Sequence, residues 1–185
     1  MFWPQNKIKE LAIVLLLITV GVVLRLLPHP ANFAPISAIA LFGGVYLSRK
    51  TALVLPLLAM LIGDFFLGFY ELRLGLTVYA SFLLIAGLGL LIKNRKSIFA
   101  VAGGALAGSI LFFLTTNFAV WAFTPWYAKT ISGLLNCYLT AIPFFKNTLL
   151  GDLFYATIFF GAYELILLSV KVKSLKVKYS VITSK

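Results

Sequence analysis

The polar side chains that could do chemistry in this sequence stand inside apolar, aromatic runs. In "IPFFKNTLLGDLFY", residues 142–155, the interruptions are Lys146, Asn147 and Asp152. A charge at the middle of a bilayer costs about 2.5–3.5 kcal/mol on insertion scales, so each of these residues needs a reason to be there. An ammonium group, an amide and a carboxylate together can orient a small solute by hydrogen bonds and charge. We therefore expect these three residues to bind a small solute.

Further candidates lie where the chain is otherwise apolar. Asp64 interrupts "LIGDFF", and Asn117 and Trp121 are four residues apart, so they share one face of a helix. The alternative is structural, with the carboxylates paired to basic side chains or helix ends. The residues predicted to bind a solute are His29, Asn32, Asp64, Asn117, Trp121, Asn136, Tyr138, Lys146, Asn147 and Asp152.

Catalytic and metal chemistry find little support in the sequence. His29 is the single histidine and Cys137 the single cysteine, so no metal-ligand cluster can be assembled from these residue types. The chain has no GxSxG, HExxH or P-loop pattern. An aspartyl dyad of Asp64 and Asp152 is the remaining enzymatic alternative. We expect a protein that is not an enzyme and that has no cofactor and no metal.

The composition places these residues in a membrane protein. Of the 185 residues 62% are hydrophobic and only 11% are charged, and the mean hydropathy is +1.03. A soluble domain of this size could not cover that much apolar side chain with so little polar surface. We predict an all-α, polytopic bundle with six spans, at 8–27, 35–48, 51–70, 75–92, 98–123 and 147–170.

Two segments do not fit a standard span. The second, "ISAIALFGGVYLS", is short for a crossing of about 20 residues, so it crosses tilted in a thinned bilayer, starts inside the protein or is partly re-entrant. Residues 128–145 are expected to form an interfacial or re-entrant segment on the outer side. Residues 1–170 form a single transmembrane domain and 171–185 a basic cytoplasmic tail, which lies on the lipid surface or is solvated.

The basic residues predict the topology. With both termini inside, twelve of the sixteen lie on the inner side and four, Arg25, Arg73, Lys129 and Lys146, on the outer side. The net charge of +11 then reflects topology and attraction to anionic lipid of the inner leaflet rather than nucleic acid. The N-terminus, with Lys7 and Lys9 before an apolar run, is interpreted as a retained helix rather than a cleaved signal, because no small-x-small site follows.

Small residues recur on the fifth predicted span. Ala100, Gly104 and Gly108 are spaced four apart and so form a stripe along one face. Such stripes let membrane helices approach closely, and we expect helix packing here rather than ligand binding.

Three separated segments carry a family resemblance. "RLLPHPANFAPISAIALFGG" at 25–44, "TTNFAVWAFTPWY" at 115–127 and "GLLNCYLTAIPFFKNTLLGDLFY" at 133–155 resemble a family of small bacterial membrane proteins, domain of unknown function 6580, described as transport proteins. The resemblance implies a multi-pass protein of the bacterial cytoplasmic (inner) membrane.

A looser, fold-level likeness points to the S components of energy-coupling-factor (ECF) transporters. It implies six helices with both ends cytoplasmic, an outer ligand pocket gated by the link "PHPANFAP", and an energising ATPase module as partner. The first span lacks the small-xxx-small pattern by which S components dock their coupling subunit, which is a departure from that family.

Two functions follow from these patterns. The first is binding and uptake of a small, vitamin-like solute from the outer face. The second is a membrane scaffold or assembly subunit that docks a partner protein through the same polar cluster. An enclosed polar cavity reaching the outer face would favour the first, and an outward-facing patch the second.

Overall fold

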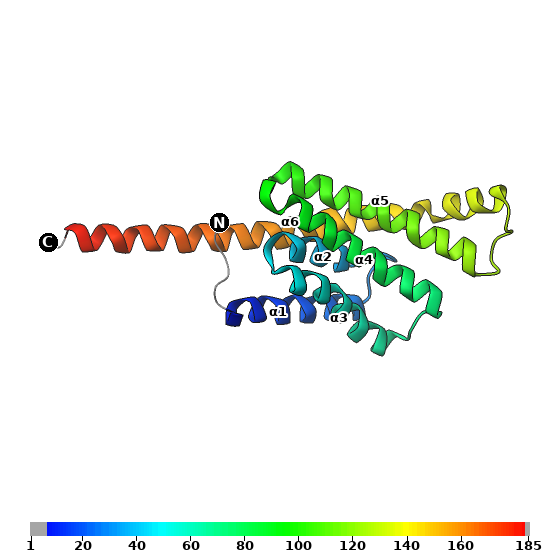
Figure 1. The fold of residues 1–185 in the computed structure, drawn as a ribbon, viewed down its shortest axis with the longest axis horizontal. Coiled ribbons are helices and arrows are strands. Elements are labelled where there is room, and N and C mark those ends of the chain that lie inside the picture. Colours follow the sequence, from blue (N-terminus) through cyan, green and yellow to red (C-terminus); the bar gives the residue numbers. More distant parts are fainter. Residues whose placement is uncertain (1–6, 184–185) are drawn as a thin grey trace.

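The structure is a computed structural model that describes the backbone of residues 7–183 and the side chains of 7–172. Over these residues the chain is helical, as expected (Figure 1). Its elements are α1 (Lys7–Leu26), α2 (Ile36–Tyr46), α3 (Arg49–Leu67), α4 (Leu72–Ile92), the short 3₁₀ turn η1 (Lys93–Arg95), α5 (Ile98–Phe123) and α6 (Ile131–Thr183). Five of the six predicted spans therefore correspond to separate helices, with bounds that differ by three residues or fewer.

Helix α2 is the centre of the bundle. All eleven of its residues are buried, and it packs against α3, α4, α5 and α6. At 1.5 Å per residue it is about 16 Å long, roughly half of a bilayer core. The link 27–35 leads into it, and Pro35 at its start is fully buried. Of the three explanations for the short second segment, the structure supports the one in which the helix starts inside the protein.

Glycines allow α2 and α4 to cross at van der Waals distance. A Cβ added at Gly44 would lie 2.7 Å from the Cα of Gly89 and would overlap the carbonyl oxygen of Ala86. The predicted small-residue stripe on α5 lies against the same pair of helices. A Cβ at Gly104 would contact Leu41 and Ile92. Gly108 faces Ile85, and Ala100 is half-buried at the start of the stripe.

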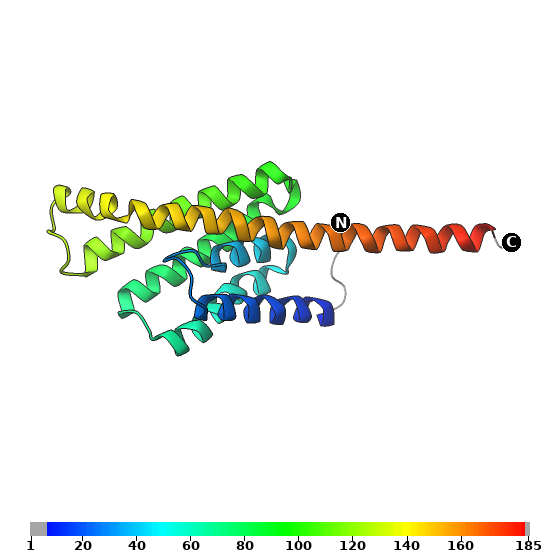
Figure 2. The same cartoon turned by 180° about the vertical axis from the view of Figure 1, so that it is seen from behind.

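Helix α6 corrects the prediction for the C-terminal third of the chain. Residues 131–145, expected to form a separate interfacial or re-entrant segment, are the first turns of one 53-residue helix that continues to Thr183. Pro143 removes one backbone hydrogen bond, which neighbouring helices in a membrane can compensate, so it does not end the helix. Figure 2 shows α6 running along the whole bundle and projecting beyond it. The helix passes without a break through the predicted boundary at residue 170.

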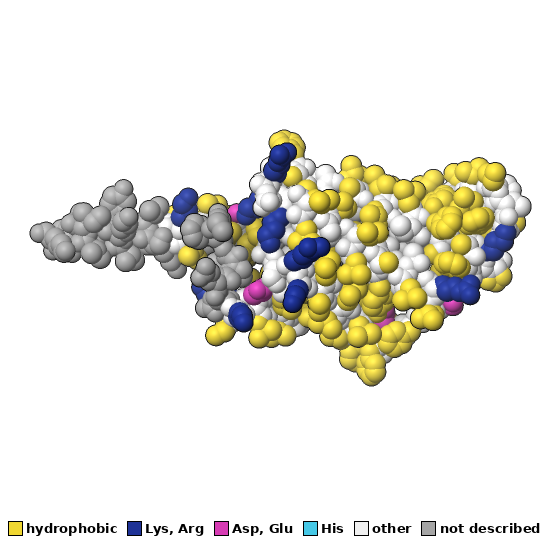
Figure 3. Space-filling model, viewed as in Figure 1, with side chains coloured by type: hydrophobic (Ala, Val, Ile, Leu, Met, Phe, Trp, Pro, Cys, Tyr) yellow, Lys and Arg dark blue, Asp and Glu magenta, His cyan; other side chains and the backbone are white. Residues whose placement is uncertain are grey.

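Within the described part of the chain, four helical segments are long and apolar enough to cross a membrane: 49–67, 72–95, 98–123 and 131–172. Helix α1 carries the charged residues Lys7, Lys9, Glu10 and Arg25, and α2 is too short to cross. The six predicted spans are therefore present as six helices, of which α3 to α6 have the length and hydropathy of a membrane span. Large hydrophobic side chains are exposed along the bundle (Figure 3), among them Leu84, Leu106, Leu114, Leu150 and Ile158. Soluble monomers rarely expose so much apolar surface, and these features are those of a membrane protein.

The two ends of the bundle differ. We call the end that carries the link 27–35 and the α5–α6 connection the link end. The end from which α6 projects is the tail end, where α1 also begins (Figure 1). Lysines and arginines gather at the tail end in Figure 3, and fewer lie at the link end.

Candidate functional site

A buried ion pair joins three helices near the link end. The guanidinium of Arg25 on α1 lies 2.6 Å from Asp64 Oδ1 on α3, and the Tyr79 hydroxyl of α4 donates to Asp64 Oδ2 at 2.8 Å. Gly63 leaves the space that the guanidinium fills, because a Cβ there would lie 2.5 Å from Arg25 Nη1. Arg25, in the last turn of α1, is thus a largely buried structural group.

Two adjoining cavities open beside this pair. Cavity A, about 280 Å³, lies between the link and helices α1 to α6. Cavity B, about 320 Å³, lies between α4, α5 and α6. They share lining from the link, α4, α5 and α6, which makes them one hollow of two lobes. The shared lining residues are Asn32, Tyr70, Val78, Phe112 and Thr148.

The walls are apolar and aromatic with a few polar groups, as in most sites for small organic ligands. Cavity A presents Arg25, His29, Asn32, Ser37, Tyr70 and Thr148. Cavity B presents Thr116, Asn117 and the exposed Trp126 beside the shared residues. Arg25 is already neutralised by Asp64, so the hollow presents hydrogen-bonding groups rather than net charge.

The link covers this hollow and is fastened to α6. Its turn is closed by the Phe33 amide, which donates to the Pro30 carbonyl at 3.0 Å, and Asn32 adopts φ 64°, a conformation that asparagine tolerates better than most residues. The Phe33 ring packs on Phe154 and Tyr155, with its backbone close to Gly151. The Asn147 amide donates to the Ala31 carbonyl at 3.0 Å.

The structure therefore brings together part of the predicted set. His29, Asn32 and Asn117 line the hollow, Asn147 fastens its cover, and Asp64 holds the Arg25 side chain that forms part of the wall. Asp152 lies deeper, where its Oδ2 accepts a 2.6 Å hydrogen bond from the Ser109 hydroxyl. Asp64 and Asp152 hydrogen-bond to different helices, so these contacts do not join them as a dyad.

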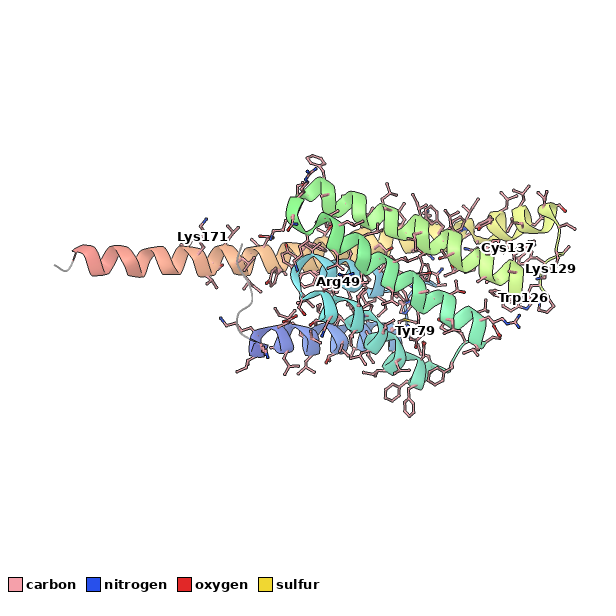
Figure 4. The ribbon with its side chains drawn as sticks, in the orientation of Figure 1. Arg49, Tyr79, Trp126, Lys129, Cys137 and Lys171 are labelled. Carbon is pink, nitrogen blue, oxygen red and sulfur yellow. The ribbon has the colours of Figure 1, made fainter. Side chains whose placement is uncertain are left out.

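The other four predicted residues lie elsewhere at the link end. The Trp121 indole donates to the Ala128 carbonyl at 2.9 Å, and Tyr138 donates to the Leu114 carbonyl at 2.8 Å. Asn136 and Lys146 are exposed. Figure 4 shows Trp126, Lys129 and Cys137 at this same end, with Tyr79 further into the bundle.

Sequence reasoning missed several groups around the hollow. Ser37, Thr116 and Thr148 gave no signal, because serine and threonine are common in membrane helices and often bond to their own helix. Tyr70, in the connection between α3 and α4, was also missed. Arg25 was counted only among the basic residues of the outer side, and its partner could not be identified from spacing.

A third cavity lies at the tail end and has a different character. It is larger, about 520 Å³, and lies where α2, α5 and α6 meet, with mostly apolar walls such as Val101, Ala156 and Phe160. Its charged groups are already paired, because Lys96 and the Tyr46 hydroxyl both donate to Glu164 at 2.9 and 2.5 Å. Despite its size, its walls are more apolar than those of the hollow at the link end.

Among the described residues, no group of three or more histidine, cysteine, aspartate or glutamate side chains lies close enough together to hold a metal ion.

Comparison with known proteins gives a family. The sequence profile of DUF6580, a family of unknown function, matches residues 5–175. The chain belongs to this family. Neither a curated protein nor a solved structure matches it. The family membership predicted from three motifs is thus confirmed over nearly the whole chain, whereas the likeness to S components has no matching structure behind it.

Proposed function

We propose that this DUF6580 protein is a membrane protein that binds a small solute at the link end and takes it up across the bacterial cytoplasmic membrane. The observation that carries the proposal is the hollow itself: two adjoining cavities of about 280 and 320 Å³ under a chain segment held by a few contacts. Ligand pockets commonly measure about 300–1,000 Å³, so the two lobes together suit a molecule of vitamin size.

The lining favours a flat, uncharged solute. Phe112, Tyr70 and Trp126 offer aromatic faces, and the Asn32 and Asn117 side chains offer amide donors and acceptors. Since Arg25 is paired with Asp64, a free anion would gain little there. A heteroaromatic compound with ring nitrogens and carbonyls matches this combination of stacking and hydrogen bonding.

Topology and energy supply belong to the same proposal. The link end faces outside and the basic tail end faces the cytoplasm and anionic lipid. The protein carries no chemistry of its own and needs no cofactor, and an ATPase module is the partner that would energise uptake.

A thermal-shift screen of the detergent-purified protein tests solute binding. Vitamins, nucleobases and their precursors are added singly. A ligand at about 100 times its Kd stabilises the native state by about 2.7 kcal/mol and raises the melting temperature. Asn117→Ala should abolish the shift, whereas Asn136→Ala, an exposed amide outside the hollow, should leave it intact. No shift with folded protein, or equal loss in both variants, would contradict the proposal.

A second candidate function rests on the two predicted residues that point outward. Asn136 and Lys146 are exposed on α6 and could dock a partner protein, as a scaffold or assembly subunit would require. Photo-crosslinking in cells from position 136, with position 87 on α4 as control, tests it. One discrete adduct specific to position 136 would support the scaffold function, and none would count against it.

A further inference from the structure

Asp152 is a buried carboxyl group without a basic partner. Its residue is 2% exposed, its Oδ2 accepts a hydrogen bond from the Ser109 hydroxyl at 2.6 Å, and the Ser37 side chain of α2 lines the same small gap. Asp64 is equally buried but has the guanidinium of Arg25 at 2.6 Å. The two buried aspartates therefore have different partners: Asp64 is half of an ion pair, and Asp152 accepts a hydrogen bond from a serine hydroxyl.

The helices packed around Asp152 bring no charge to it. The gap beside its side chain is lined by Ser37, Ala38 and Leu41 of α2, Ile85 of α4, and Ala105 and Gly108 of α5. On α6 itself, Tyr155 is the titratable residue within one turn, and Lys146 is exposed six residues earlier. None of the described residues around the gap can neutralise a carboxylate.

Burying an isolated carboxylate in an apolar interior costs many kcal/mol, and binding a cation removes that cost. A metal ion would need about six oxygen ligands. The gap has no room for a water molecule, and its polar lining is limited to the Asp152 carboxyl and the Ser37 hydroxyl. A proton needs no such space.

We propose that Asp152 is a proton-binding site, connected to the hollow at the link end through Ser37. Ser37 lines both cavity A and the gap at Asp152. A hydronium ion in cavity A gives a proton to the Ser37 oxygen while the Ser37 hydroxyl gives its own proton to the carboxylate. The carboxylate becomes a neutral acid and hydronium becomes water. Ser109 donates to Oδ2, which leaves Oδ1 to carry the proton.

This site goes beyond solute binding and is tested without any solute. Infrared spectra of the protein in phosphatidylcholine vesicles, recorded across neutral pH, report the C=O stretch of a protonated carboxyl group. The wild type should show this band at neutral pH. Asp152→Asn should lose it, and Glu71→Gln, which changes an exposed carboxyl group that caps α4, should keep it. A wild type without the band, or a band that survives in Asp152→Asn, would overturn the proposal.

Two further measurements decide the matter if Asp152→Asn does not fold. Ser109→Ala removes the donor to Oδ2, so the band should remain but shift in frequency, and an unshifted band would overturn the assignment. Thermal stability should also fall as the pH of the wild type is raised, because the native state then holds a proton that the unfolded chain has released. Stability that does not fall with rising pH counts against the site.

Discussion

Arg25 and Asp64 form an ion pair 2.6 Å long whose side chains are only 9% and 1% exposed. Removing one partner leaves the other charge buried, which typically costs about 3–5 kcal/mol. We therefore expect Asp64→Asn to lower the free energy of unfolding in mixed micelles by about that amount. The double variant Arg25→Met/Asp64→Leu should recover much of the loss, since it buries no charge. Additive losses in the double variant would show that the pair does not act as a unit.

The crossing of α2 and α4 should be intolerant of any side chain at Gly44. Gly44→Ala places a methyl group against Gly89 and the Ala86 carbonyl, and overpacking of this kind costs about 1–3 kcal/mol. The unfolding free energy measures it. Gly87→Ala on α4 is the matched control, because a Cβ there meets nothing within 4 Å. It should be neutral or slightly stabilising, since alanine favours helix more than glycine does. Equal effects at both positions would refute the close crossing.

The link 27–35 should open more often when its hydrogen bond to α6 is removed. Asn147→Ala deletes the 3.0 Å bond to the Ala31 carbonyl, worth about 1 kcal/mol, or about fivefold in the open population. Hydrogen exchange of the backbone amides of residues 31–34 measures that population. The neighbouring Lys146→Ala changes an exposed side chain and should leave exchange unchanged. Faster exchange in both variants would mean that Asn147 does not hold the link.

The two ends of the bundle should react with a membrane-impermeant thiol reagent from opposite sides. In a Cys137→Ala background, Ser132→Cys marks the link end and Lys50→Cys the tail end, both at exposed positions. In intact cells we expect labelling of Ser132→Cys, and of Lys50→Cys only after the membrane is permeabilised. The reverse pattern would invert the proposed orientation, and the solute would then be bound from the cytoplasmic side.

The amino-acid sequence by itself determined the helices and their environment. An apolar run can satisfy its backbone groups in lipid only as a helix, so the lengths of the runs predicted five of the helices to within three residues at each end. It also marked Asn117 and Asn147 as notable, because polar groups in such runs are costly. The sequence also predicted a break between helical segments before residue 147, but α6 continues through that position.

Only the tertiary structure decided which of these side chains meet. A helix that is apolar all round shows no inward face in its sequence, so its rotation about its axis depends on the helices packed against it. That rotation joined Arg25 to Asp64, placed Asn117 in the hollow and left Asn136 outside it. It also set Asp152 beside Ser109, a pairing of α5 with α6 that no spacing along the chain could reveal.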